Sequence, residues 1–253
     1  MEIAEEDGAI IALDQEKAYN KIQHDYLWTT LKAFGIPTPF IKTIQELYHN
    51  AYTIVAINGV FSKPYQVKQG VRQGDPLSCA LFNIAIEPLA CRIGNEPTIK
   101  GINILGLIDK LAIKLFADDT NLYLHKEDNF HLVQRILEEW CEVSGAKFND
   151  EKTEIIPIGS EEHCCNTAAT RILGPCNHTP LPEGTRIAKD RDAVRMLGAW
   201  IGNKMEDLTP WEPIIDKINT KLEKWKRTHP TLNGQKVIMQ MVIRGHTQFL
   251  SQA

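Results

Sequence analysis

The adjacent acids Asp118 and Asp119 are the residues of this chain best suited to chemistry. They interrupt a run of strand-forming residues, 114–124, in which apolar side chains flank the acidic pair. Neighbouring residues of a strand point to opposite faces, so a tight hairpin turn is needed to aim both carboxylates at a common point. At a few ångströms the two charges repel by about 4 kcal/mol at an effective dielectric constant of about 20. A bound divalent cation reverses that repulsion, although Asp is also an ordinary turn residue.

A third acid, Asp14, ends an apolar run at residues 9–14 that is typical of a short buried strand. If this strand pairs beside the 114–124 hairpin, Asp14, Asp118 and Asp119 converge. Three carboxylates favour Mg²⁺, which prefers oxygen ligands, with Mn²⁺ as an alternative. Two such ions about 4 Å apart activate a hydroxyl nucleophile and stabilise a leaving oxygen, which is the chemistry of nucleotidyl transfer.

The composition sets the class of protein in which this site would work. The chain has 253 residues, 43% of them apolar and 24% charged, which is ordinary for a globular protein of one large or two smaller domains. The sequence shows no run of eighteen apolar residues and no secretory signal, so we expect an intracellular protein without a membrane span. The net charge is −4, but residues 211–253 carry seven Lys or Arg against three Asp or Glu.

The six cysteines are interpreted as reduced thiols. A structural zinc site is the alternative for one cluster, although that cluster lacks paired CxxC spacing. Its members are Cys164, Cys165, Cys176, His163 and His178.

Helices and strands are mixed without regular alternation, which predicts an α+β fold. Helices are predicted over residues 24–34, 38–50, 77–92, 129–143, 211–225 and 232–250, and strands over 9–14, 52–57, 60–67 and within 114–124, with a strand turn at 193–203. Asn58-Gly59 predicts a hairpin turn, and Asp75-Pro76 predicts the start of a helix. The polar stretch 159–190 is predicted to form loops around short strands.

Five blocks of sequence occur in a fixed order and carry a family resemblance. They are Asp14-x-x-Lys17-Ala18-Tyr19, the run from Gln69-Gly70 through Arg72-Gln73-Gly74-Asp75-Pro76 to Ser78, Phe116-Ala117-Asp118-Asp119, Ser144-Gly145 with Asn149-x-x-Lys152-Thr153-Glu154, and Met196-Leu197-Gly198. Together they resemble a reverse transcriptase of the non-LTR (LINE-type) retrotransposon kind, over nearly the whole chain.

The resemblance implies a right-hand polymerase. Residues 1–205 would form the palm, an antiparallel sheet with helices on one face, with a remnant of the fingers. Its catalytic blocks would lie at 14–20, 69–78, 116–120, 144–154 and 195–202. Residues 206–253 would form part of a helical thumb. Because the chain starts just before the first block, we expect a fragment from which the fingers are largely missing.

The resemblance also implies roles for the acids and their neighbours. Asp14 and Asp118 would be metal ligands, and Asp119 would complete the catalytic cluster. Tyr19 would lie under the incoming sugar and select dNTPs over rNTPs, although a core aromatic is an equal alternative from the residue alone. Lys152 would act near the leaving pyrophosphate as a general acid or charge stabiliser, with a plain surface lysine as the alternative.

The remaining implied contacts are with nucleotide and nucleic acid. The run Gln69, Gly70, Arg72, Gln73 and Gly74 would contact the dNTP and the template base, since its glycines allow close approach. Leu197 and Gly198 resemble a primer-grip turn. Lys217, Lys221 and Lys224 recur at helical spacing and would track a duplex backbone, unless they form a solvated helix face. The partners implied are an RNA template, a DNA primer and dNTPs, acting in the nucleus.

Two other interpretations remain open at the level of sequence. The chain is alternatively a truncated, inactive retroelement remnant that at most binds primer–template duplex. An RNA-templated RNA polymerase of the viral type has a related palm, but Tyr19 and the Ala117 before Asp118, in place of Gly, argue against it. Asn20 stands where many relatives carry Asp, and we expect that departure to have a mild effect.

Overall fold

A five-stranded sheet organises the first part of the chain. The structure is a computed structural model that describes residues 6–104, 110–177, 180–196, 199–203, 211–226 and 230–247. It divides into two compact units, 1–189 and 190–253, which are described separately. The sequence analysis placed the boundary between palm and thumb at 205/206, and the assignment of these names to the two units stays a prediction.

The sheet of the first unit has the strand order β6-β7-β1-β8-β9. Its strands are β1 (Gly8–Gln15), β6 (Ile113–Phe116), β7 (Asp119–His125), β8 (Phe148–Ile158) and β9 (Arg186–Ile187). The central strand β1 runs antiparallel to both β7 and β8. The edge strand β9 is parallel to β8, while the other pairings of this sheet are antiparallel, as predicted. The α+β class is confirmed.

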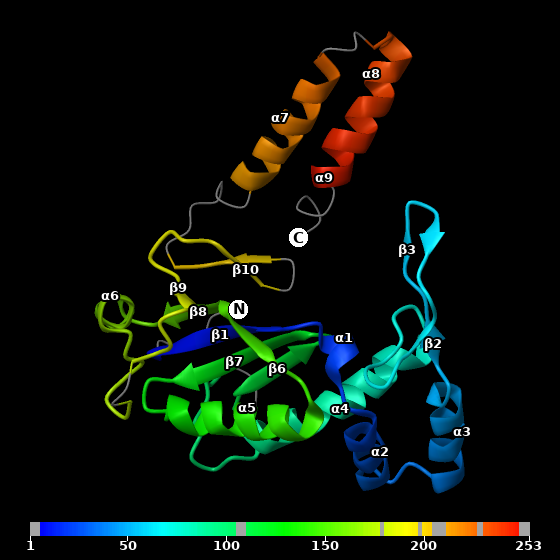
Figure 1. Cartoon of the computed structure of the whole chain (residues 1–253). Helices are drawn as coiled ribbons and strands as arrows, with labels where there is room; N and C mark the ends of the chain where they lie inside the picture. Colours follow the sequence, from blue (N-terminus) through cyan, green and yellow to red (C-terminus); the bar gives the residue numbers. More distant parts are fainter. Residues whose placement is uncertain are drawn as a thin grey trace. The chain divides into compact units, whose positions relative to one another are not determined.

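One face of the sheet carries the hydrophobic core. Ala9, Ile11 and Leu13 alternate along β1 and are buried beside Leu122 of β7 and Ile155 of β8. Helices α4 and α5 lie against this face (Figure 1). The helices of the unit are α1 (Ala18–Lys21), α2 (His24–Ala33), α3 (Thr38–Tyr48), α4 (Pro76–Gly94), α5 (Phe130–Ser144) and α6 (Glu161–Thr170).

Helix α4 is the most buried helix of this unit, and its start is capped as predicted. Asp75 accepts a hydrogen bond from the backbone N–H of Leu77 at 2.9 Å, and Pro76 opens the helix. By length and composition α4 is apolar enough to cross a membrane. Its side chains Leu81, Phe82 and others are instead buried in the core of the unit, which accounts for its apolar character.

Two elements differ from the sequence prediction. Helix α6 occupies part of the stretch predicted as loops. It is capped by Ser160, whose hydroxyl accepts from the N–H of His163, and it opens with two acids at its positive end. Its polar sequence has no apolar stripe, so periodicity did not reveal it. Strand β8, eleven residues long, was likewise not predicted.

A long hairpin follows α3, as Asn58-Gly59 predicted. Its inner pair is β3 (Ala56–Ile57) with β4 (Val60–Phe61), and its base pairs β2 (Tyr52–Thr53) with β5 (Tyr65–Gln66). Asn58 and Gly59 both have positive φ, 50° and 81°, which is the requirement of a type I′ turn.

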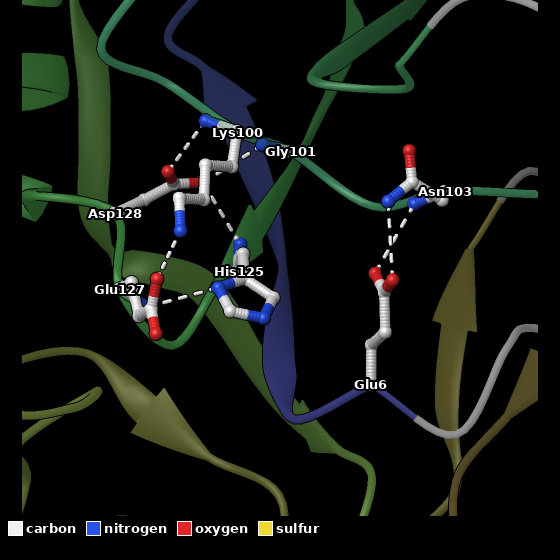
Figure 2. A network of polar contacts seen from close by, with 7 residues as sticks. All are labelled: Glu6, Lys100, Gly101, Asn103, His125, Glu127 and Asp128. Atoms are coloured by element: carbon white, nitrogen blue, oxygen red, sulfur yellow. Dashed lines mark hydrogen bonds and ion pairs between the residues drawn. The ribbon is translucent and has the colours of Figure 1, made fainter.

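A buried carboxylate ties the end of β7 to the segment before β6. Asp128 is fully buried and accepts hydrogen bonds from the backbone N–H groups of Lys100 (2.6 Å), Gly101 (2.9 Å) and His125 (2.9 Å) (Figure 2). Nearby, Lys100 pairs with Glu127, and Glu6 accepts from Asn103. The network fixes the turn between β7 and α5, and hence the far end of the strand that starts at Asp119.

The second unit combines a short hairpin and a helical pair. Strands β10 (Val194–Met196) and β11 (Ala199–Ile201) form the predicted strand turn. Helix α7 (Glu212–Lys226) packs on the following helix through Ile218, Ile238 and Val242. That second helix runs as α8 (Leu232–Ile238), a π-helical turn (Met239–Arg244) and α9 (Gly245–Thr247), so the predicted 232–250 helix is described only to residue 247.

Candidate active site

The hairpin between β6 and β7 presents two of the three acids. Phe116 pairs with Asp119, so Ala117 and Asp118 form a two-residue turn. Ala117 adopts φ 54°, a conformation that such hairpin turns require and that glycine adopts most readily. Asp118 and Asp119 are both exposed. The turn therefore projects the acidic pair out of the sheet edge, as the sequence analysis expected.

The third acid lies at the end of the neighbouring strand. The register of β1 against β7 runs to the pair Leu13 and Thr120. Asp14 and Asp119 are the next residues beyond this pair, so both lie at the same end of the two neighbouring strands. The predicted pairing of the 9–14 strand beside the hairpin is thus observed.

The acids influence one another electrostatically. The pKa of Asp119 is raised above that of an ordinary aspartate, first by partial desolvation of its carboxyl group among neighbouring atoms and then by the negative charges of Asp118 and Asp14. A bound cation would offset the mutual repulsion of these carboxylates. Carboxylate oxygens are also the donors that Mg²⁺ prefers, so the chemistry of these three residues fits a magnesium site.

Within the part of the chain that the structure describes, no three His, Cys, Asp or Glu side chains stand in metal-holding geometry. Asp14 Oδ2 lies instead 3.6 Å from the Nζ atom of Lys152. Both side chains are well exposed, at 40% and 67%, so a cation can displace the lysine at little cost.

An irregularity in β8 brings Lys152 to this position. Ala12 pairs with Glu154, but two residues later Asp14 pairs with Asn149, so β8 carries extra residues at this point. The hydroxyl of Thr153 donates to the carbonyl of Asn149 at 2.9 Å and closes this extra segment. The position of Lys152 beside Asp14 is therefore a consequence of strand irregularity, which sequence periodicity does not report.

The predicted nucleotide loop is anchored through Gly70. Its N–H donates to Ile22 O at 2.7 Å, and its carbonyl oxygen lies 2.9 Å from Nε2 of His24. Gly70 has φ 80°, and a Cβ atom there would lie 2.6 Å from the carbonyl oxygen of Tyr19. Gln69 donates to the carbonyl oxygen of Asn20 at 3.3 Å. His24 was not singled out from the sequence.

The outer part of the loop is exposed. Arg72 donates to the carbonyl of Leu47 and its guanidinium lies 5.0 Å from the centre of the Tyr48 ring. Gln73 and Gly74 are exposed, and Gly74 has open space around it. A hollow of about 630 Å³ adjoins the loop. Among the residues that line it are Asn20, Tyr52, Tyr65, Gln69, Arg72 and Gln73. Tyr52 and Tyr65 are lining residues that the sequence analysis missed.

Tyr19 lies between the acids and this loop. It follows Ala18 in the short helix α1, is partly buried, and stacks on Phe82 of α4. The pKa of Tyr19 is raised first by a hydrogen bond to Cys79 and by burial, with smaller contributions from the charges of Cys79 and Asp118. Tyr19 is therefore packed on the core, and its contact with the incoming sugar stays a prediction.

The other predicted residues lie elsewhere. Leu197 and Gly198 fall outside the described residues. Lys217, Lys221 and Lys224 are exposed on one side of α7 in the second unit. In the alternative zinc cluster, His163 Nε2 lies 3.0 Å from the carbonyl oxygen of Gly8, and His178 is outside the described residues.

Comparison with known proteins identifies the class. The family of reverse transcriptases (RNA-dependent DNA polymerases) matches residues 2–201. The chain belongs to this family, and its five blocks fall within or at the edge of the matched region.

The relatives that it resembles include proteins of non-LTR retrotransposons. A 149 kDa protein of transposon TX1 from Xenopus laevis, described as uncharacterized, is 32% identical over 152 residues, 60% of this chain and 12% of that protein. A polyprotein of the retrotransposable element R2 from Popillia japonica is 33% identical over 165 residues, 65% of this chain and 25% of that protein. The predicted resemblance to reverse transcriptases of non-LTR retrotransposons is confirmed. The chain spans a quarter or less of the length of these two relatives.

Among solved structures, a telomerase from Candida tropicalis in complex with a fragment of telomeric RNA is similar to this chain with a TM-score of 0.43. The sequence identity is 16%, and the match covers 60% of this chain and 26% of that one.

Proposed function

We propose that this chain is the RNA-directed DNA polymerase core of a LINE-type retrotransposon. It would transfer a nucleotidyl group from a dNTP to the 3′-hydroxyl of a DNA primer paired with an RNA template. The observation that carries this proposal is the position of Asp14, Asp118 and Asp119, one at the end of β1 and two in the adjacent hairpin, with charges that raise the pKa of Asp119. Membership of the reverse transcriptase family supports the same reaction.

Asp14, Asp118 and Asp119 would hold two Mg²⁺ ions, or Mn²⁺. When bound, such ions supply activation of the attacking hydroxyl and stabilisation of the leaving oxygen. Lys152, 3.6 Å from Asp14, stands at the edge of the acidic cluster. Its ammonium group can donate a proton to the leaving pyrophosphate or neutralise its charge.

The residues around the acids would select the substrate. The Tyr19 ring would exclude a 2′-hydroxyl, and the loop of Gln69, Gly70, Arg72, Gln73 and Gly74 would contact the dNTP and the template base. Gly70 packs closely on the carbonyl of Tyr19, and this contact would hold the loop in place as a binding surface. Arg72 would have to exchange its contact with the Leu47 carbonyl for one with nucleotide.

Contacts with nucleic acid outside the site would come from the second unit. Leu197 and Gly198 would hold the primer end, and the lysines of α7 would track the duplex backbone. The family also leads us to propose action in the nucleus, where a fluorescently tagged chain should accumulate in expressing cells. Exclusion of the tagged chain from the nucleus would contradict that part of the proposal.

Primer extension tests the reaction. We expect the purified chain to extend oligo(dT) on poly(rA) with dTTP and Mg²⁺, and Asp118→Asn to reduce the rate by at least about a hundredfold. Asp216→Asn, an exposed acid of α7, serves as the matched control and should extend normally. Extension unaffected by Asp118→Asn, or no extension by the wild-type chain, would contradict the proposal for this chain.

A further inference from the structure

The backbone of Tyr19 is fixed from two directions. The N–H of Val71 donates to the Tyr19 carbonyl at 2.6 Å, which ties the start of α1 to the nucleotide loop. The N–H of Asn20 donates to Lys17 O at 2.8 Å and closes the turn on the other side. Gly70 packs so closely on the same carbonyl that no side chain fits there. The Cα of Tyr19 therefore has little freedom to move.

The side chain of Tyr19 is held by a different element, helix α4. Its ring stacks on the Phe82 ring, with centroids 4.7 Å apart and planes inclined by 13°. Its hydroxyl donates to Sγ of Cys79 at 3.7 Å. Residues 79 and 82 are three apart in α4 and so lie on one side of the helix. One helix face thus contacts both the plane and the tip of the Tyr19 side chain.

Helix α4 cannot readily yield to pressure on the ring. Phe82 is fully buried, and its neighbours Leu81 and Ala85 are also buried in the core. The first turn is anchored by the Asp75 cap. A ring pushed toward the helix would meet close-packed side chains, which deform only at substantial cost.

We propose that Phe82 and Cys79 are positioning residues that hold the Tyr19 ring in place and thereby determine the preference for deoxyribonucleotides over ribonucleotides. The inference rests on the proposed function, in which Tyr19 contacts the sugar. Exclusion of a single hydroxyl requires a wall that does not retreat. A smaller residue at position 82 leaves a cavity into which the ring can withdraw, so that a ribose fits.

The experiment compares dUTP and UTP, which differ only in the 2′-hydroxyl, on poly(rA)·oligo(dT). For Phe82→Leu we expect the ratio of kcat/KM for dUTP to that for UTP to fall by about tenfold, because the KM for UTP decreases while the values for dUTP change little. Cys79→Ala should lower the ratio by a smaller factor than Phe82→Leu does. Cys79→Ser should keep the wild-type ratio, because its hydroxyl can accept the same hydrogen bond from Tyr19. Leu89→Ala, buried farther along α4, is the control for lost stability and should leave the ratio unchanged.

Tyr19→Ala separates failure of this inference from failure of the proposed function. If Tyr19→Ala abolishes discrimination while Phe82→Leu keeps the wild-type ratio, the positioning role is wrong and the polymerase proposal stands. If Tyr19→Ala leaves the ratio unchanged, the sugar contact itself is wrong and the inference falls with it. The dissociation constants of both nucleotides from a complex with a 3′-blocked primer give the same comparison without turnover. A wild-type complex that binds neither nucleotide overturns both proposals.

Discussion

The three acids are chemically alike but occupy different surroundings. Asp14 is paired with Lys152, Asp118 occupies the hairpin turn, and Asp119 begins β7 with a raised pKa. The pKa of Asp119 is raised first by partial desolvation of its carboxyl group and then by the negative charges of Asp118 and Asp14, and both effects oppose its ionisation in the folded chain. The site is therefore unfavourable for stability by itself, which is common for residues selected for function.

The first prediction concerns Asp119→Asn. Because the pKa of Asp119 is raised in the folded state, ionisation of this carboxyl group destabilises the folded chain. The penalty is absent below the unfolded-state pKa of about 4 and grows as the pH rises through the folded-state value. Without divalent cations, Asp119→Asn should therefore be more stable than the wild type at neutral pH. The difference should vanish below pH about 4. Urea unfolding across this pH range, with a chelator present, measures it.

Added Mg²⁺ should reverse this difference, since a ligand that binds only the folded state stabilises it. The exposed Asp216 of α7 gives the control, because Asp216→Asn should show neither effect. A wild-type chain that is the more stable of the pair in chelator at neutral pH would contradict the electrostatic account of the site.

At the scale of single residues, the sequence revealed the three acids but not the residues that pack around Tyr19 and the nucleotide loop. Asp118-Asp119 stand out because two charges interrupt an apolar run. Cys79 and Phe82 do not stand out, because a buried aromatic in an apolar helix is ordinary. Their relation to Tyr19 spans about sixty residues of chain and arises only from packing. The contact of His24 with Gly70 is hidden for the same reason.

At the scale of elements, the β6–β7 hairpin determines where the acids point. Its turn holds Ala117 at φ 54°, a region that costs a non-glycine residue about 1 kcal/mol or more. We predict that Ala117→Gly leaves stability unchanged or raises it by up to about 1 kcal/mol, since relief of strain is partly offset by unfolded-state entropy. Ala117→Val should lower stability by about 1–3 kcal/mol, because a β-branched residue is poorly tolerated at positive φ.

Chemical unfolding of the three proteins measures this series. Equal stability of the valine and alanine forms would show that the turn is not strained.

Elements were predictable where a local signal specifies them. Asn58-Gly59 and Asp75-Pro76 encode their turn and cap in two residues each, and both are confirmed. Gly145, with φ 75°, caps the end of α5, close to the helix end predicted at residue 143. Helix α6 lacked an apolar stripe, and β8 is interrupted between residues 149 and 154, so neither displays a regular period. The interruption is also what places Lys152 beside Asp14.

At the scale of the whole molecule, the first unit depends on long-range links such as that of Asp128. The Asp128 carboxylate accepts hydrogen bonds from three backbone N–H groups in two segments. The backbone carbonyl of Asp128 accepts a further hydrogen bond from the side chain of Asn177 at 2.9 Å. We predict that Asp128→Ala lowers stability by about 3 kcal/mol or more, because it leaves buried donors unpaired. Glu127→Ala, in the same turn, removes only the exposed pair with Lys100 and should change stability little.

Thermal or urea unfolding of these two variants decides the point. Figure 2 shows both side chains, and the pair is matched because the two positions are adjacent. A larger loss for Glu127→Ala than for Asp128→Ala would contradict the role of the buried network.

The second unit contributes, in this account, through charge. Lys217, Lys221 and Lys224 lie exposed on one side of α7. Replacing all three by Ala should weaken binding of an RNA–DNA duplex and reduce the slope of log K against log salt by about 2 to 3, because fewer counterions are released. Lys236→Ala, on α8, is the control for a general loss of charge. An unchanged slope in the triple variant would show that this face is only solvated.

The central claim is that Asp14, Asp118 and Asp119 together bind divalent cations, and Mn²⁺ binding tests it most directly. Electron paramagnetic resonance titration of the wild-type chain with a 3′-blocked primer–template and dTTP, beside the three Asp→Asn variants and Asp216→Asn, gives the affinities without turnover. The account predicts that each of the three substitutions weakens Mn²⁺ binding by about tenfold or more, whereas Asp216→Asn binds as the wild type does. Wild-type affinity in Asp14→Asn and Asp118→Asn would contradict it.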